Sequence, residues 1–429
     1  MLRVIEEKNN ENFIEELNSR STQDYKKVTK DVEVIIEDVK NNGNKALFKY
    51  AKKFDGFEGK DFLVKKHEIE KALEEIDKDL YETIEKAYEN IKDYHKKQKR
   101  RTSTYKPEEQ DIILGQIIRP IKKAGIYVPG GKAAYPSTVL MNAVPAKIAG
   151  VKELTMITPV GKNGIIPPSI LTAAYISGVD KIYKIGGAHG IAALAFGTET
   201  ISQVYKITGP GNIYVTAAKK IVSEKVGIDM IAGPSEILIV ADKNANPKYI
   251  AADLISQAEH DEMAASILIT DSHKLADKVN NYLLEMVDSL ERKKIIKKSL
   301  KEYGGILLTD SLNESLDIAN IIAPEHLEIL TENPFEDYKK IENAGAIFLG
   351  EFSPEPVGDY FAGPNHTLPT SGTSRFSSPL SVDDFIKKSS LIYYSKNSLE
   401  KSKDDIIRFA ENEGLTGHAN SIKVRFQED

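Results

Sequence analysis

The 429-residue chain contains no cysteine, and this absence excludes disulfide bonds, thiolate metal sites and cysteine nucleophiles together. A chain without disulfides is consistent with the cytoplasm, where such bonds are rare. The sequence also lacks any apolar run long enough to span a bilayer, and its start contains no apolar signal core. We therefore expect a soluble, cytoplasmic protein with no membrane partner.

Positive charge is not in excess either, since the formal net charge is -6. This balance argues against nucleic acid as the main partner. One basic tract, residues 96–101, could form a nucleic-acid patch. It ends a long helical pattern, where cations complement the helix dipole, and such runs are usually solvated. We expect no nucleic-acid partner.

The chain is too long for one compact core, so two or more domains are expected. Its first quarter is typical of helices, because apolar residues recur three or four positions apart through residues 24–54 and 66–101. From residue 117 onward, short apolar runs such as 154–157 and 237–240 alternate with helical segments. This alternation predicts an α/β fold with parallel sheets covered by helices on both faces.

The two ends of the chain have a different pattern from its middle. Residues 1–20 indicate a short amphipathic helix, and residues 381–429 return to a charged helical pattern. A boundary between two sheet regions is plausible near Ile231, where a second group of strands begins. No internal repeat is strong enough to define the domains.

Three Gly-Pro turns recur, and each places a hydrogen-bonding side chain three residues after the glycine. They are Gly209-Pro210-Gly211-Asn212, Gly233-Pro234-Ser235-Glu236 and Gly363-Pro364-Asn365-His366. One such turn alone is most simply a tight connection. Three together favour ligand binding, because ligands gather where loops leave parallel sheets. A Gly-x-Gly-x-x-Gly fingerprint is absent, so these motifs alone make a weak case for a nucleotide cofactor.

Four of the eight histidines stand out, all in the second half of the chain: two lie beside carboxylates, one ends a Gly-Pro turn and one follows a glycine. They are His260, His326, His366 and His418. Imidazole binds divalent metals and exchanges a proton near neutral pH. Without cysteine, this concentration suggests a nitrogen- and oxygen-liganded metal site with acid–base chemistry nearby. By contrast, we expect the histidines in Lys- and Glu-rich helical stretches to be merely solvated; these are His67, His95 and His273.

Gln257 and His260 are three residues apart in a helical stretch, so they could share a face and bind one ion. Spacing alone ranks Glu259 and Glu262 equally with Gln257 as ligands. Asp359 and His418 are reasonable completions from distant sequence. The alternative is a surface helix with a solvated histidine.

Glu325 and His326 are adjacent, and adjacent side chains usually diverge. Both can serve one site at a loop or at a helix start, and Pro324 fits the first position of a helix. A glutamate and a histidine placed in this way could divide water activation and proton transfer. The alternative is a glutamate favoured by the helix dipole beside an incidental histidine.

Taken together and in this order, seven motifs resemble histidinol dehydrogenase over nearly the whole chain. They are Tyr127-Val128-Pro129-Gly130-Gly131, Gly209-Pro210-Gly211-Asn212, Ala232-Gly233-Pro234-Ser235-Glu236, Gln257-Ala258-Glu259-His260-Asp261, Ala323-Pro324-Glu325-His326-Leu327, Gly363-Pro364-Asn365-His366-Thr367-Leu368-Pro369-Thr370 and Leu380-Ser381-Val382-Asp383-Asp384-Phe385.

The resemblance implies an NAD-dependent, zinc-containing homodimer that oxidises L-histidinol to L-histidine through the aldehyde, the last step of histidine biosynthesis. It implies that the acid–base pair is Glu325 and His326. The implied zinc ligands are Gln257, His260, Asp359 and His418, and these residues with His326 would also bind the substrate. Further implied substrate contacts are Ser235, His366 and Glu413, and the implied cofactor contacts are Tyr127, His189 and Asn212.

The resemblance also implies a division into two Rossmann-like parallel-sheet domains with helical N-terminal and C-terminal extensions. The expected parts are an N-terminal helical segment (1–23), a discontinuous first α/β domain (24–126 and 232–380), a second Rossmann-like domain (127–231) and a helical tail (381–429). The tail would carry Glu413 and His418 into the site of the partner subunit, so that the active sites are shared.

One position departs from the family pattern. His189 follows Gly186-Gly187-Ala188, where the family usually has glutamine. Imidazole can still donate or accept a hydrogen bond, but its reach and shape differ from those of an amide.

Two other classes of protein could carry the same residues. A zinc hydrolase would use the same ligands with an open position to activate water, and would need no NAD. A binding or scaffold protein would produce no NADH from histidinol.

Overall fold

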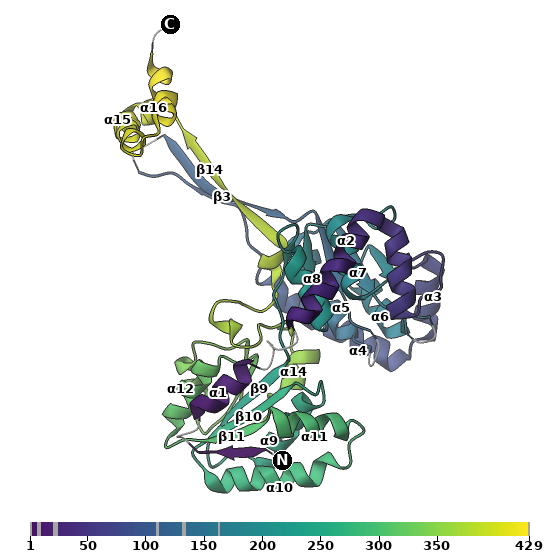
Figure 1. Cartoon of the computed structure of the whole chain (residues 1–429). Helices are drawn as coiled ribbons and strands as arrows, with labels where there is room; N and C mark the ends of the chain where they lie inside the picture. The colour runs from purple at the N-terminus through teal and green to yellow at the C-terminus, as the bar shows by residue number, and fades with distance from the viewer. Residues whose placement is uncertain are drawn as a thin grey trace. The chain divides into compact units, whose positions relative to one another are not determined.

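The computed structural model describes residues 2–6, 10–19, 25–108, 111–130, 134–161 and 164–427. These residues form two compact units, shown in Figure 1. The first comprises Met1–Gln98 and Ile121–Phe385, and the second comprises Lys99–Pro120 and Ile386–Asp429. The first unit contains two parallel sheets, so the predicted α/β class is confirmed.

One of these sheets has five strands, all parallel, in the order β6-β5-β4-β7-β8. The strands are β4 (Lys123–Tyr127), β5 (Glu153–Thr158), β6 (Lys181–Lys184), β7 (Lys206–Thr208) and β8 (Gly227–Ile228). The connecting helices are α5 (Pro136–Ala149), α6 (Pro168–Ile176), α7 (Gly187–Phe196) and α8 (Ile213–Val222). Strands β5 and β6 lie on one side of β4, and the later strands β7 and β8 lie on its other side. The strand order therefore reverses between β4 and β7, which is where parallel sheets bind ligands at their carboxyl ends.

The helices of the first quarter cover this five-stranded sheet. They are α2 (Tyr25–Tyr50), η2 (Ala51–Asp55), α3 (Lys66–Glu75) and α4 (Lys78–Lys96). Helix α2 packs on α7 and α8, α3 packs on α6, and α4 packs on α5. The predicted first α/β domain joined residues 24–126 to residues 232–380. The helices of the first quarter instead bury their apolar stripe in the core of the five-stranded sheet, which lies outside residues 232–380. The domain boundaries as such stay a prediction.

The second sheet has six parallel strands in the order β1-β11-β10-β9-β12-β13. They are β1 (Arg3–Ile5), β9 (Glu236–Ala241), β10 (Ala265–Thr270), β11 (Gly305–Leu308), β12 (His326–Leu330) and β13 (Ala346–Leu349). Around it lie α1 (Asn10–Ser19), α9 (Pro247–Ala258), α10 (His273–Val287), α11 (Lys293–Glu302), α12 (Leu312–Ile322), α13 (Pro334–Asp337), η3 (Tyr338–Lys340) and α14 (Glu355–Tyr360).

Helices cover both faces of the six-stranded sheet (Figure 1), and the side chains on both faces are buried. Ile237 and Ile239 point into a core shared with α9, α10 and α11. Leu238 and Val240 point into the opposite core, shared with α1 and α12. This burial on both sides explains why β9 is apolar at nearly every position, as strands of parallel sheets are.

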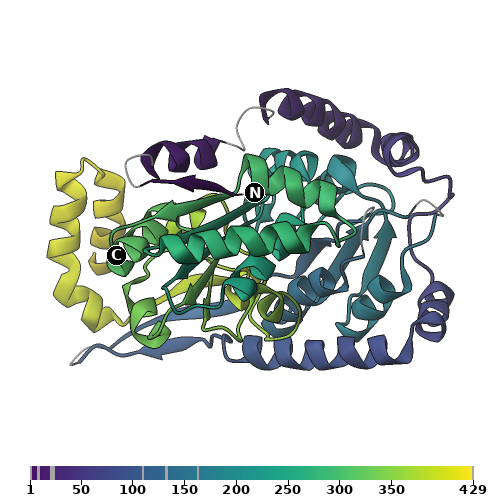
Figure 2. The same cartoon turned by 90° about the horizontal axis from the view of Figure 1, so that it is seen from below.

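The N-terminal segment differs from its prediction in one respect. Helix α1 is present at Asn10–Ser19, but Arg3–Ile5 form the edge strand β1, which pairs with β11. Figure 2 shows this strand and α1 in purple. A strand of three residues is too short for its period of two to be read from the sequence.

The second unit is a three-stranded antiparallel sheet followed by helices. Its strands are β2 (Ser103–Tyr105), β3 (Ile112–Pro120) and β14 (Ile386–Tyr394), and its helices are α15 (Lys396–Asn412), α16 (Thr416–Lys423) and η6 (Val424–Phe426). The tail thus contains the expected helices, but its beginning is a strand. Strand β14 is exposed along most of its length, so its side chains show no buried-and-exposed alternation. The short helices η4 (Thr373–Arg375) and η5 (Val382–Phe385) precede it.

In the described part of the chain no helix is both long and apolar enough to cross a membrane.

The expectation that His95 is solvated is wrong, because its side chain is fully buried. Its Nδ1 lies 2.8 Å from the carbonyl oxygen of Ile91 and its Nε2 lies 3.4 Å from the amide nitrogen of Asn365.

Candidate active site

The imidazole of His326 is the centre of the candidate site, at the amino ends of β9 and β12. His326 is the first residue of β12, which pairs with β9 through the register His326↔Ile237. Its Nδ1 lies 3.1 Å from the carbonyl oxygen of Glu236, so Nδ1 carries the proton and donates it. Among the described residues, Nε2 is buried without a hydrogen-bond partner. In its neutral form the ring would keep a free lone pair on Nε2, as a general base requires.

Carboxyl groups surround this imidazole. Nδ1 lies 3.9 Å from Glu325 Oε2 and 4.0 Å from Glu355 Oε1, and Nε2 lies 3.7 Å from Asp359 Oδ1. Desolvation favours the neutral ring, but the negative charges of Glu355, Glu325 and Asp359 outweigh it and raise the pKa of His326 well above its ordinary value. The imidazole of His326 is therefore easily protonated at this site.

Glu325 is held against the start of β9. Its Oε2 accepts a hydrogen bond from the backbone N–H of Glu236 at 3.0 Å. Burial raises the pKa of Glu325 to about 7, although the neighbouring His326 lowers it. A carboxyl group of this kind exchanges its proton near neutral pH, as a general base for water does.

The sequence left two placements open for Glu325 and His326, a loop or a helix start at Pro324, and the helix start is wrong. Helix α12 ends at Ile322, Ala323 adopts a left-handed conformation with φ of 53°, and the chain then enters β12. Glu325 precedes the strand, so its side chain is not bound by the alternation within β12. Both side chains therefore reach one site, as the pairing of glutamate and histidine indicated.

A possible metal-binding group lies beside the acid–base pair. His260, Glu355 and Asp359 each place a ligand atom within 4.8 Å of the others. His260 lies just beyond α9, where its N–H donates to the carbonyl oxygen of Gln257 at 3.2 Å. Helix α9 ends at Ala258, so His260 approaches this group from a turn and not from the helical face that the spacing indicated.

Gln257 is fully buried at the edge of the same group. When its amide nitrogen is oriented toward the Glu355 carboxylate, it donates to Oε1 at 2.8 Å and to Oε2 at 3.2 Å. This orientation satisfies both groups and turns the amide oxygen of Gln257 away from Glu355. The amide oxygen is the atom of Gln257 that could bind a cation.

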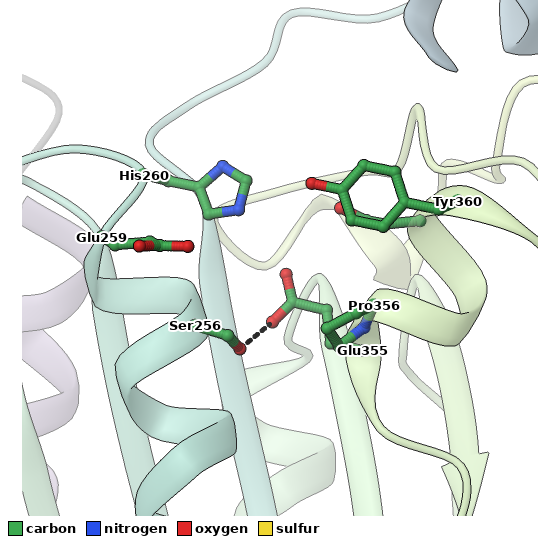
Figure 3. Close-up of a pocket in the computed structure, with 7 residues that line it drawn as sticks. Ser256, Glu259, His260, Glu355, Pro356 and Tyr360 are labelled. Carbon is green, nitrogen blue, oxygen red and sulfur yellow. Dashed lines mark hydrogen bonds between the residues drawn. The ribbon is translucent and has the colours of Figure 1, made fainter. Parts of the chain in front are cut away.

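A cavity of about 60 Å³ separates the end of α9 from α14. Figure 3 shows His260 and Glu355 directed toward it, with Ser256 hydrogen-bonded to Glu355 at 3.4 Å. Its lining is Ser256, Glu259, His260, Glu355, Pro356, Asp359 and Tyr360. The donors are nitrogen and oxygen atoms, as zinc binds in proteins, and the volume exceeds that of a single small ion or water.

Charge also distinguishes the members of this group. Desolvation lowers the pKa of His260 although its side chain reaches solvent, so the ring is neutral and can bind a metal near pH 7. Burial opposes ionisation of Asp359, but His326, His366 and His260 together lower its pKa. Asp359 is therefore the carboxyl group of the three-residue group that ionises most readily.

Glu355 was not predicted from the sequence. It is buried at the start of α14, and its backbone N–H donates to Glu328 Oε1 at 2.8 Å. Burial raises the pKa of Glu355 to about 8. Its local sequence, Ser-Pro-Glu-Pro, indicates only a turn or a helix start, so no signal in the sequence separates it from an exposed glutamate.

Other predicted ligands have different surroundings. Glu262, which spacing ranked with Gln257, forms a surface ion pair with Lys298. Glu259 lines the cavity but is not part of the group of possible ligands. Glu413 ends α15 and His418 lies in α16, both exposed and both in the second unit. The role of these two tail residues stays a prediction.

Two predicted substrate contacts lie next to the site. His366 places Nδ1 3.0 Å from the carbonyl oxygen of Asp359. Ser235 directly precedes Glu236, and its carbonyl oxygen accepts from the N–H of Ala265 at 3.0 Å. Their proximity is compatible with the predicted role, which stays a prediction.

The predicted cofactor residues follow strands of the five-stranded sheet. Tyr127 is the last residue of β4, and Asn212 caps the start of α8 by accepting from Tyr214 and Val215. His189 lies in the first turn of α7, where its buried ring contacts Tyr50 and Phe54. Its Nε2 lies 3.1 Å from Asp55 Oδ2. Contact of these residues with a cofactor stays a prediction.

The fold and the site together are those of an α/β enzyme in which an acid–base pair adjoins a possible metal centre. A family model described as histidinol dehydrogenase matches residues 18–426. The chain is 55% identical to the histidinol dehydrogenase of Clostridium acetobutylicum over 97% of this chain and 96% of that protein. It is 51% identical to that of Lactococcus lactis over 97% of both.

A solved structure gives the same result. The crystal structure of histidinol dehydrogenase from Elizabethkingia anophelis superposes with a TM-score of 0.94 at 39% identity, covering 99% of this chain and 98% of that one. The chain belongs to the histidinol dehydrogenase family. It is therefore an oxidoreductase of histidine biosynthesis that acts on a small molecule.

The geometry of the possible metal centre predicts a graded loss of zinc affinity. His260→Ala and Asp359→Ala should weaken zinc binding most, because each removes a direct donor. Glu355→Gln should weaken it by about 10–100-fold, as loss of a group that orients a ligand typically does. Competition with a chromophoric zinc chelator measures all three affinities.

The matched control is Glu262→Gln, which alters a surface ion pair. It should bind zinc as the unaltered chain does. Equal weakening by Glu262→Gln and His260→Ala would contradict this assignment.

Proposed function

We propose that this chain catalyses the NAD-dependent, four-electron oxidation of L-histidinol to L-histidine through L-histidinaldehyde, as a zinc-containing homodimer. The observation that carries the proposal is the position of His326 in a chain of this family. Its ring lies next to Glu325 and also next to Glu355 and Asp359, which belong with His260 to the possible metal-binding group.

Gln257, His260, Asp359 and His418 would hold the zinc ion. The first three fit the ion, because neutral imidazole, amide oxygen and ionised carboxylate are donors that zinc accepts. Bound zinc supplies an anchor for the imidazole and amine nitrogens of histidinol, and so orients the substrate. Ser235 and His366 from this unit, with Glu413 from the tail, would complete the substrate contacts.

His326 would move the proton of the reacting alcohol. The Glu236 carbonyl fixes the proton on Nδ1, so Nε2 is the atom that accepts. The nearby carboxylates favour the imidazolium that forms, since they raise the pKa of His326. The same atom can accept a second proton in the aldehyde step after it returns the first to solvent.

Glu325 would take a proton from water so that the aldehyde becomes hydrated. A pKa of about 7 lets this carboxyl group be ionised before the step and protonated after it. Its hydrogen bond from the N–H of Glu236 keeps Oε2 next to the imidazole. The two residues thus have separate tasks in one site.

NAD, the hydride acceptor when bound, would occupy the carboxyl edge of the five-stranded sheet. The strand order reverses there between β4 and β7. Tyr127 and Asn212 lie at this edge, and the intervening turn begins with Gly209, whose φ of 118° suits glycine. These features fit a ligand that approaches the backbone closely. His189 would contact NAD at the start of α7.

The tail would carry Glu413 and His418 to the partner subunit's site. Within the second unit, Ile392, Tyr393 and Phe409 expose large apolar side chains, as a surface that binds another chain does. We propose a homodimer with shared active sites, located in the cytoplasm.

The central test is histidinol-dependent NADH formation, followed by absorbance. The expected result is NADH in the presence of zinc and its loss after a chelator, because the substrate then lacks its anchor. Zinc-dependent hydrolysis without NAD would instead favour the hydrolase alternative, and no turnover of any kind would favour a binding protein.

Glu325→Gln should slow oxidation of histidinaldehyde more than oxidation of histidinol, because only the aldehyde step needs an activated water. In the unaltered chain the aldehyde step should weaken as the pH falls through about 7, where Glu325 becomes protonated. The variant should lose this part of the pH dependence. Comparison of the two half-reactions measures both effects, and equal losses in both would remove the proposed division of tasks.

Mixing defective subunits tests the shared sites. His326→Ala and His418→Ala subunits should each be inactive, but a randomised mixture should regain about one quarter of full activity, because half of the dimers have one intact site. A mixture of Glu325→Gln and His326→Ala subunits is the control and should regain none. Failure of the first mixture to exceed the second would place all these residues in a single chain's site.

A further inference from the structure

We infer that the buried ion pair between Lys219 and Asp229 positions the Gly209–Asn212 turn for NAD, and so determines the cofactor affinity of the enzyme. Lys219 lies on α8 and Asp229 follows β8. Neither is among the residues to which the proposed function gives a role. The inference rests on NAD as the cofactor of that proposed function.

The pair is almost completely removed from solvent. Its side chains are 4% and 1% exposed, and Lys219 Nζ contacts Asp229 Oδ1 directly. Burial of two charges is costly before they pair, so a buried pair seldom stabilises a fold more than an apolar pair of similar size does. We therefore expect the pair to have a role other than stabilising the fold.

Both side chains also form hydrogen bonds with the backbone of one residue, Gly209. Asp229 Oδ2 accepts a hydrogen bond from the N–H of Gly209 at 2.8 Å. Lys219 Nζ donates to the carbonyl oxygen of Gly209 at 2.9 Å. The two peptide groups that flank Gly209 are thus held from both sides by the two members of the ion pair.

Gly209 itself is tightly confined. Its φ is 118°, and a Cβ added to it would lie 2.1 Å from the carbonyl oxygen of Tyr127. The turn therefore rests on the end of β4, where the strand order reverses. A shift of Gly209 would displace the peptide next to Tyr127 as well.

The same turn places Asn212. The side-chain oxygen of Asn212 accepts from the N–H groups of Tyr214 and Val215 at 3.0 and 3.2 Å. Asn212 is consequently fixed to the start of α8, and the clamp on Gly209 sets its position relative to Tyr127. Small displacements of groups that contact a ligand can cost a large factor in binding or rate.

A second glycine turn at the same edge has a similar arrangement. Asp55 Oδ2 accepts from the N–H of Gly186 at 3.1 Å and also lies 3.1 Å from Nε2 of His189, on the helix that follows. In both turns an aspartate from outside the turn holds a glycine N–H and pairs with a basic side chain on the next helix. The repetition supports a role for these pairs in shaping this edge of the sheet.

The test uses three variants of the full chain: Lys219→Met, Asp229→Leu and the double variant. Removal of one partner leaves a buried charge unpaired and lowers stability, whereas the double variant should regain most of the melting temperature. We expect the double variant still to show a KM for NAD raised about tenfold or more, since the backbone of Gly209 has lost both restraints. KM for histidinol and zinc affinity should stay within about twofold of the unaltered chain.

Lys206→Met is the matched control. It removes a partly buried ion pair with Asp384 at the opposite end of β7, at 3.3 Å, and should leave KM for NAD unchanged. A double variant that regains both stability and NAD affinity would show a purely structural pair and overturn the inference. An unaltered chain that forms no NADH from histidinol would instead overturn the proposed function, and the inference with it.

Discussion

The arrangement of the site depends on one imidazole that is surrounded by buried carboxyl groups. His326 is bonded through Nδ1 to a backbone carbonyl oxygen, and Glu325, Glu355 and Asp359 lie within 4.0 Å of its ring nitrogens. Grouping acids in this way is costly unless a cation is present. Protonation of His326 supplies one positive charge, and a metal ion beside His260 would supply more.

The parallel pairing of β9 and β12 creates this grouping. It places the carbonyl and the N–H of Glu236 against His326 and Glu325, so the proposed catalytic pair is oriented by backbone groups of a central strand. The backbone of a central strand is rigid, and a rigid support is what proton transfer requires. Conversely, a change of register between β9 and β12 by one residue would separate both side chains from their partners.

The two parallel sheets use opposite ends of their strands. In the six-stranded sheet the acid–base pair lies at the amino ends of β9 and β12, whereas ligands of such folds usually bind at carboxyl ends. In the five-stranded sheet, Tyr127 and the Gly209 turn do lie at the carboxyl edge. The general rule thus describes the proposed cofactor region but not the proposed catalytic residues.

Much of the fold follows from local patterns in the sequence. Alternating apolar runs and helical segments indicated parallel sheets, because such strands are buried on both faces. The pattern could not show which sheet the first helices cover, since an apolar stripe does not specify its partner. It also missed β1 and β14, the first too short and the second exposed.

The candidate site was predictable where unusual neighbours stand together in sequence. Glu325-His326 and Gln257 with His260 were found in this way. Glu355 was missed because its partners, Glu328, Gln257 and His326, are all distant in sequence. The burial of His95 was missed for the same reason, since its partner Asn365 lies 270 residues away.

The most direct test of the account is anomalous X-ray diffraction at the zinc edge, from crystals grown with zinc. A zinc ion held as proposed gives one strong peak per chain at about 2.0–2.2 Å from a nitrogen of His260 and an oxygen of Asp359. A zinc ion bound to neither residue, with these side chains unchanged, would contradict it.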